Sequence, residues 1–121
     1  MFANRADRCT TSTTTNFGLL SVSAQPGSKF LILEATIKNL SNNPQIIVPG
    51  SVIINSGSKP YRFSVTEEII GDPLAIPDDP INPLIPQKIR VVFRIPDEVS
   101  GLVRWEPGWN PDRLAVSCGK I

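Results

Sequence analysis

Histidine is absent from this chain of 121 residues, and its charged residues are few and balanced in sign. Without histidine the chain lacks the commonest general base and metal ligand, and it has no glycine-rich phosphate loop or nucleophile elbow. Lys and Arg number 12 against 11 Asp and Glu, and the basic residues are scattered along the sequence. We therefore expect neither an enzyme with a cofactor or metal nor a nucleic-acid-binding protein.

Long apolar runs are missing as well. No stretch approaches the roughly 18 apolar residues of a membrane-spanning helix, so no transmembrane segment is expected. The N-terminus also lacks the basic-then-apolar pattern of a signal peptide. For an exported protein, the expectation is a mature or trimmed form whose leader has been removed.

Cysteine is limited to Cys9 and Cys118, near opposite ends of the chain. If they pair, they enclose a loop of about 110 residues, a constraint worth about 4–5 kcal/mol in the loop-closure account. A disulfide needs an oxidising compartment, and no histidine is present to activate a thiol or to complete a metal site. The pair therefore favours a structural disulfide in a secreted or cell-surface protein over two free thiols.

Two stretches alternate apolar and polar side chains with a period of two, which is typical of half-buried antiparallel strands. They are Lys29–Asn43, with Leu31, Leu33, Ala35 and Ile37 on one face, and Lys88–Pro96, with Ile89, Val91, Phe93 and Ile95 on one face. The 12 prolines fall mostly between apolar runs, where they mark strand ends. Long helices are excluded, and Glu67–Gln87 is expected to be a long crossover loop.

Shorter strands are predicted between turn signals, at Phe17–Ala24, Gln45–Val48, Val52–Ile54, Tyr61–Val65, Gly101–Glu106 and Arg113–Cys118. Pro49-Gly50 indicates a bend or a strand that changes sheets, and Ser56-Gly57 indicates a hairpin. The fold class is therefore all-β, an immunoglobulin-like two-sheet antiparallel β-sandwich of about seven or eight short strands. A small barrel is the alternative. Residues 1–16 are a polar, Thr-rich N-terminal arm or edge strand, and residues 17–121 form the sandwich domain.

Three blocks carry a family resemblance: FLILEATIKNLSNNP at 30–44, GSKPYRF at 57–63 and VVFRIP at 91–96. With their surroundings, from Phe17 to Cys118, they resemble a telokin-like immunoglobulin-fold domain family of unassigned function, found in secreted or lipid-anchored bacterial and archaeal proteins. The chain departs from the family at Ile85-Pro86-Gln87, where a Pro-Gly turn is usual. The resemblance implies a fold and an extracytoplasmic setting, and it brings no catalytic residues.

Carboxylates offer weak candidate sites. Oxygen ligands for calcium could come from the proline-rich loop, through Asp72, Asp78, Asp79 and Asn82. Their spacing matches no defined calcium loop, and Asp and Asn beside Pro are ordinary turn formers, which we favour. Glu67 and Glu68 are adjacent on an extended chain and point to opposite faces, so they are not expected to act on one substrate.

Tryptophan gives a second candidate site. Trp105 continues an apolar alternation and is expected in the core, whereas Trp109 lies in a Gly-Asn-Pro turn. With Asn110 and Arg113 it forms a candidate binding site, able to stack on a sugar or to fill a partner's pocket. A tryptophan folded back over the end of the sandwich is the favoured alternative. Asn39-Leu40-Ser41 also matches an N-glycosylation acceptor, a motif that is common by chance.

The leading functional hypothesis is a non-enzymatic, extracytoplasmic interaction or structural module that binds another protein or an envelope component. Within it, self-association into filaments could use the N-terminal arm as a strand added to a neighbouring subunit. The alternative is a carbohydrate-binding module that uses Trp109. An enzyme ranks last, because its carboxylates would have to converge from separate parts of the chain.

Overall fold

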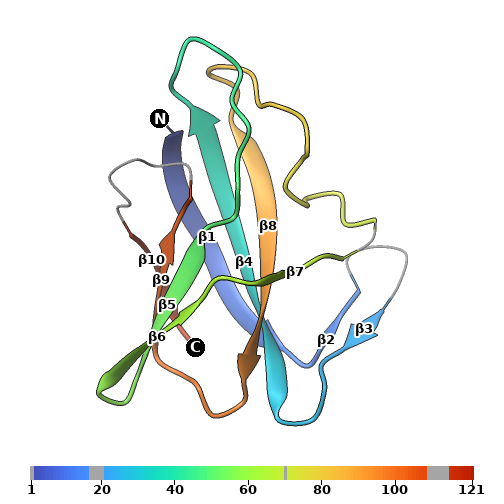
Figure 1. The fold of residues 1–121 in the computed structure, drawn as a ribbon, viewed down its shortest axis with the longest axis vertical. Coiled ribbons are helices and arrows are strands. Elements are labelled where there is room, and N and C mark those ends of the chain that lie inside the picture. The colour runs from blue at the N-terminus through green and yellow to red at the C-terminus, as the bar shows by residue number, and fades with distance from the viewer. Residues whose placement is uncertain (1, 17–20, 70, 109–114) are drawn as a thin grey trace.

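The computed structural model describes residues 2–16, 21–69, 71–108 and 115–121. Within these residues the chain forms strands and no helix (Figure 1). The strands are β1 (Phe2–Ser12), β2 (Thr14–Thr15), β3 (Val22–Ser23), β4 (Ser28–Asn39), β5 (Ser51–Ser56), β6 (Lys59–Phe63), β7 (Thr66–Glu67), β8 (Gln87–Pro96), β9 (Leu102–Glu106) and β10 (Val116–Lys120). Among these residues there is also no helix with the length and apolar character needed to span a bilayer.

Two antiparallel sheets of four strands face one another. Their strand orders are β1-β4-β8-β7 and β10-β9-β5-β6, and β2 and β3 form a separate hairpin. Without β2 and β3, the strands β1, β4, β5, β6, β7, β8, β9 and β10 correspond to A, B, C, C′, D, E, F and G of an immunoglobulin sandwich. The two orders then become A-B-E-D and G-F-C-C′, which is the arrangement of immunoglobulin sheets. The predicted fold class, an all-β antiparallel sandwich, is confirmed.

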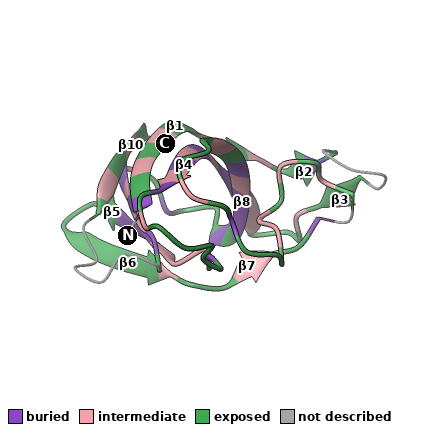
Figure 2. Ribbon diagram, turned by 90° about the horizontal axis from the view of Figure 1, so that it is seen from above, coloured by how far each residue is buried: buried purple, intermediate pink, exposed green. Residues whose placement is uncertain are grey.

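The core lies between the two sheets, where the predicted apolar faces meet. All eight residues of the two alternating faces are at most 3% exposed. Val52 and Ile54 on β5 and Val103 and Trp105 on β9 pack against them from the other sheet. Figure 2 shows these buried stretches gathered in the middle of the molecule, with the β2–β3 hairpin outside the two layers. The core position predicted for Trp105 is confirmed, since its side chain is fully buried.

A second, smaller cluster lies on the outer face of the first sheet. Phe30 and Ile32 of β4 contact Val92 of β8, and Ile69 and Ala24 pack over them. The prediction of a strand with one buried face is therefore wrong over Phe30–Leu33, where four consecutive residues are buried. The loop that follows β7 covers this part of the sheet, which a period of two does not reveal.

The N-terminal segment is an edge strand of this molecule's own sheet. β1 pairs with β4 from Phe2↔Asn39 to Ser12↔Phe30. The chain then turns back, and Thr14 and Thr15 pair with Ser23 and Val22. The predicted strand Phe17–Ala24 is reduced, in its described part, to the two exposed residues of β3; residues 17–20 lie outside the described residues.

A β-bulge in β1 brings the first cysteine to the core. The register shifts between Ala6 and Arg8, so Asp7 has no register partner in the ladder with β4. Ala6 and Cys9 both pack against the core although they are an odd number of residues apart, because the extra residue reverses the alternation. Cys9 forms a disulfide with Cys118 of β10, with a Cα–Cα distance of 5.6 Å. The predicted disulfide is confirmed, and it joins the edges of the two sheets.

Asp7, the extra residue of the bulge, is held by polar contacts on the outer face. Thr36 Oγ1 donates a hydrogen bond to its carboxylate over 2.7 Å, and Arg5 Nε lies 2.7 Å from the other oxygen. The hydrogen bond from Thr36, with a smaller effect of Arg5, lowers the pKa of the Asp7 carboxyl below its ordinary value. The disulfide of Cys9 therefore holds the bulge on the inner side of the sheet, and the polar contacts of Asp7 hold it on the outer side.

The connection between β4 and β5, residues 40–50, crosses from one sheet to the other, and we call it the crossing segment. Asn39 secures its start: the fully buried amide donates to the carbonyl oxygens of Asn43 and Ile81, over 2.9 and 2.8 Å, and accepts from Ser41 N and Oγ. Trp105 Nε1 secures its end by donating to Pro49 O over 2.9 Å. Both ends of the crossing segment are therefore attached to the core.

Two predictions for the crossing segment have different outcomes. The bend at Pro49-Gly50 is confirmed: Gly50 has a φ of 75°, and a Cβ there would lie 2.1 Å from the carbonyl oxygen of Glu106. The strand Gln45–Val48 is wrong, since only Gln45 forms a bridge, to Ile81. A chain that crosses between two sheets has no neighbouring strand to pair with.

The turn before β8 has an unusual backbone conformation at the residue that precedes Ile85-Pro86-Gln87. Leu84 has a φ of 64°, a conformation that favours glycine. Its N–H donates to Asn39 O over 2.8 Å, so the turn is tied to the end of β4. This end of the sandwich therefore depends on Asn39 twice, through its side chain and through its carbonyl.

We expect the Cys9→Ser/Cys118→Ser double variant to unfold at a lower urea concentration, with a loss of about 2–5 kcal/mol, because the unfolded chain regains the freedom of a large loop. Urea denaturation followed by tryptophan fluorescence measures this. Adding a reductant should shift the wild-type midpoint to that of the variant and leave the variant unchanged. Equal midpoints for oxidised wild type and variant would contradict the stabilising role.

We expect Asn39→Ala to lower the free energy of unfolding by about 2–3 kcal/mol, because it removes the four hydrogen bonds of a fully buried amide, including the one that Ser41 N donates. The matched control is Asn42→Ala, three residues along, whose exposed side chain forms no hydrogen bond in the described part of the chain. The control should stay within about 0.5 kcal/mol of wild type. Chemical denaturation of both variants measures the difference, and equal losses would refute the assigned role.

Candidate functional site

A groove of about 480 Å³ lies beside the crossing segment. Residues from three parts of the chain line it: Ile46–Pro49 of the crossing segment, Thr66–Ile69 with residues 72 and 75–78 of the proline-rich loop, and Arg90–Val92 of β8. In Figure 1 these parts are the green connection leading to β5, the yellow-green chain around and after β7, and β8. The groove therefore lies where the sandwich is bordered by connections and by the short strand β7.

The lining combines aliphatic side chains with negatively charged ones. Aliphatic side chains come from all three parts, and two of them, Ile46 and Val48, are 63% and 51% exposed. The charged lining residues are Glu67, Glu68, Asp72, Asp78 and Arg90. Four carboxylates against one guanidinium give the lining a formal charge of −3, whereas the whole chain carries +1.

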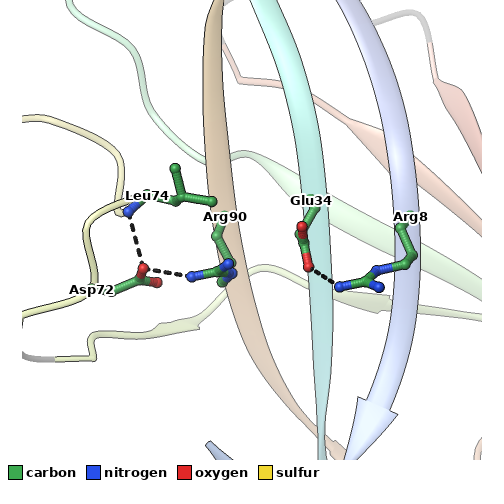
Figure 3. A network of polar contacts seen from close by, with 5 residues as sticks. All are labelled: Arg8, Glu34, Asp72, Leu74 and Arg90. Carbon is green, nitrogen blue, oxygen red and sulfur yellow. Dashed lines mark hydrogen bonds and ion pairs between the residues drawn. The ribbon is translucent and has the colours of Figure 1, made fainter. Parts of the chain in front are cut away.

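One buried ion pair attaches the proline-rich loop to the sheet. Arg90 Nη1 lies 2.7 Å from Asp72 Oδ1, and the two side chains are only 13% and 3% exposed. The same carboxylate oxygen accepts a hydrogen bond from Leu74 N, and Arg90 N donates to Leu74 O over 2.7 Å. Figure 3 shows the contacts of the Asp72 carboxylate with Arg90 and with Leu74 N. Asp72 and Arg90 therefore neutralise each other and hold one side of the groove in place.

The ion pair continues into a row of charges of alternating sign across the outer face of the sheet. Arg90 of β8 is the register partner of Glu34 on β4, and Glu34 accepts a hydrogen bond from Arg8 of β1 over 2.5 Å (Figure 3). The row passes from the loop over β8 and β4 to β1. It favours the observed strand register, since opposite charges face each other on neighbouring strands.

Two carboxylates of the groove remain uncompensated. Glu67 pairs with Arg94 over 2.9 Å, and Asp72 pairs with Arg90. Glu68 and Asp78 are exposed and take part in no ion pair within the described residues. These two side chains therefore supply the free negative charge of the groove.

The calcium candidates do not come together as a site. In the described part of the chain, no group of three or more Asp, Glu, His or Cys residues is placed to hold a metal ion. Asp72 is bound to Arg90, while Asp78, Asp79 and Asn82 are exposed. The structure thus gives Asp72 a different role, that of attaching the loop.

The remaining candidates divide between buried and undescribed residues. Trp109, Asn110 and Arg113 lie outside the described residues, so the glycan hypothesis stays a prediction. The glycosylation interpretation of Asn39 is wrong for the folded chain, because its amide is fully buried and donates two hydrogen bonds. The Asn39 side chain therefore has a structural role, since its hydrogen bonds hold the start of the crossing segment.

Sequence reasoning missed the groove, although one signal was available. The run Gln45-Ile46-Ile47-Val48 stands between Pro44 and Pro49. Three consecutive aliphatic residues between prolines cannot all face one core in an extended segment, so at least one of them had to face outward. Which other parts of the chain would lie beside them could not be known without the topology.

Comparison with known proteins supports the fold and leaves function open. No protein-family model and no curated protein matches the chain. A solved structure from Clostridium difficile 630, described as an uncharacterized beta-sandwich protein, is similar to it with a TM-score of 0.63 and 14% sequence identity. The match covers 96% of this chain and 83% of the other. At this identity the likeness shows a shared β-sandwich fold.

We expect Asp72→Asn to destabilise the protein by about 3 kcal/mol, because it removes one charge of a largely buried ion pair while the Arg90 guanidinium stays charged. Asp79→Asn, an exposed aspartate of the same loop, is the matched control and should stay within about 0.5 kcal/mol of wild type. The double variant Asp72→Leu/Arg90→Met should lose less than Asp72→Asn, since no buried charge remains. Urea denaturation measures all three, and a loss in the double variant equal to or above that of Asp72→Asn would contradict the assignment.

Proposed function

We propose that this protein is a non-enzymatic interaction module that works outside the cytoplasm and binds another protein at the groove. The observation that carries the proposal is the exposure of Ile46 and Val48, 63% and 51%, on a segment that is fixed at both ends. Exposed aliphatic side chains on a preorganised backbone lose little entropy on binding and gain from burial. Such a surface suits a protein partner.

The proposed extracytoplasmic setting rests on the disulfide between Cys9 and Cys118. Disulfides persist in oxidising compartments and are rare in the cytosol. Membership of the telokin-like immunoglobulin-fold family is part of the same proposal. Its support is the immunoglobulin order of the strands together with the β-sandwich neighbour.

Self-association through residues 1–16 is the less favoured form of this proposal. β1 already pairs with β4 along its length and is tied to β10 by the disulfide. Adding β1 to a neighbouring molecule would first require these pairs to open. A separate partner at the groove needs no such rearrangement.

A photo-crosslinking amino acid placed at Val48 tests the proposal in cells of the source organism. The control position is Leu102 on β9, which has a similar exposure of 44% and does not line the groove. Irradiation should give a discrete protein adduct from position 48 and none from position 102. Adducts of equal yield from both positions, or none from position 48, would refute binding at the groove.

A further inference from the structure

The backbone beside the groove is a connection that pairs with no strand of the described residues. The exposures of Ile46, Ile47 and Val48 are 63%, 4% and 51%, so Ile47 faces the core and its two neighbours face outward, which is the alternation of an extended chain. Gln45 exchanges two hydrogen bonds with Ile81, and Pro49 O accepts from Trp105. Between these anchors, the N–H and C=O groups of Ile46–Val48 form no hydrogen bond within the described residues.

An unpaired, extended backbone next to a groove is the geometry for strand addition. An added peptide strand gains affinity from main-chain hydrogen bonds and specificity from its alternate side chains. Here the side chains of Ile46 and Val48 offer an apolar surface to every second residue of such a peptide. Because the segment is fixed by Asn39 and Trp105, its backbone is ordered before the peptide arrives.

The charge of the groove selects the kind of peptide. Glu68 and Asp78 are exposed, line the groove and form no ion pair with any residue that the structure describes. They do not belong to a converging group of carboxylates in the described part of the chain, so a compact metal ion would not be held there. The long side chains of lysine and arginine can reach separate carboxylates from one extended backbone.

We propose that the groove binds an extended, basic segment of a partner protein by strand addition to Ile46–Val48. Alternate apolar residues of the segment contact Ile46 and Val48, and its lysine or arginine side chains pair with Glu68 and Asp78. This inference rests on the proposed function and specifies the chemistry of the partner.

Selection from a displayed library of random 12-residue peptides tests the inference. Peptides selected on the wild-type protein should be enriched at least threefold in Lys and Arg over the starting library, with apolar residues at alternate positions. A synthetic copy of a selected peptide should bind Glu68→Lys/Asp78→Lys at least tenfold more weakly by fluorescence anisotropy. The matched control is Asp97→Lys/Glu98→Lys, which makes the same charge change on two exposed residues outside the groove. Its affinity should stay within twofold of wild type at the same salt concentration.

N-methylation of the peptide backbone tests strand addition separately. In an added strand, every second peptide residue points its N–H at Ile46–Val48. Methylation of these nitrogens should weaken binding at least tenfold, whereas methylation of the nitrogens that point away should change the affinity less than threefold. Equal effects at both sets of positions would overturn strand addition.

The remaining outcomes separate the inference from the function on which it rests. Selection of neutral or acidic peptides, failure to enrich any peptide, or unchanged affinity in Glu68→Lys/Asp78→Lys overturns the basic segment as the ligand. If Val48 still gives an adduct in cells, the interaction function survives that result with a partner of other chemistry. If Val48 gives no adduct, the proposed function itself is refuted, and the inference that rests on it is refuted as well.

Discussion

Strands β4 and β8 pair from Ser28↔Pro96 to Ile37↔Gln87, and every other part of the sandwich is placed relative to this ladder. β1 and β7 complete the sheet on either side, and the opposite sheet packs on its inner face. Over Phe30–Leu33 the ladder is buried on the outer face too. Beyond Phe30–Leu33, where only the inner face is buried, a one-residue slip would move the apolar residues to the outer face, so burial of the inner face specifies the register.

The ladder also determines where the chain must form an irregular connection between the two sheets. β4 ends at Asn39 in one sheet, and β5 begins at Ser51 in the other, so residues 40–50 must cross between the layers. A crossing segment cannot pair with either sheet along its whole length, and its polar groups need other partners. Asn39 and Trp105 supply them at the two ends. The middle, Ile46–Val48, pairs with no strand in the described parts of the chain, and the groove lies beside it.

Sequence periodicity predicted the parts of the fold that depend on two-residue alternation. It gave both core strands with their buried faces, the core position of Trp105 and the sandwich class. It did not predict the burial of Phe30, because Ile69, which covers this side chain, comes from a connection between strands. It also predicted a strand at Gln45–Val48, where the topology places no neighbouring strand to pair with. The groove could not be predicted for the same reason, since its lining comes from residues 46–49, 66–69, 72, 75–78 and 90–92. The bulge at Asp7, which turns Cys9 to the core, leaves no signature in the sequence pattern.

The free edges of the sheets differ in how open they are to a further strand. β1 and β10 border the side that the disulfide between Cys9 and Cys118 closes. β6 carries Lys59, Pro60 and Arg62, and both proline and exposed cations discourage pairing at an edge. β7 has two residues, too few to guide a long partner. Ile46–Val48 has neither a charge nor a proline within it, and its flanking prolines limit its length. The edge strands β1, β6, β7 and β10 therefore disfavour the addition of a further strand, whereas Ile46–Val48 lacks these features and is the segment where we expect a partner strand to bind.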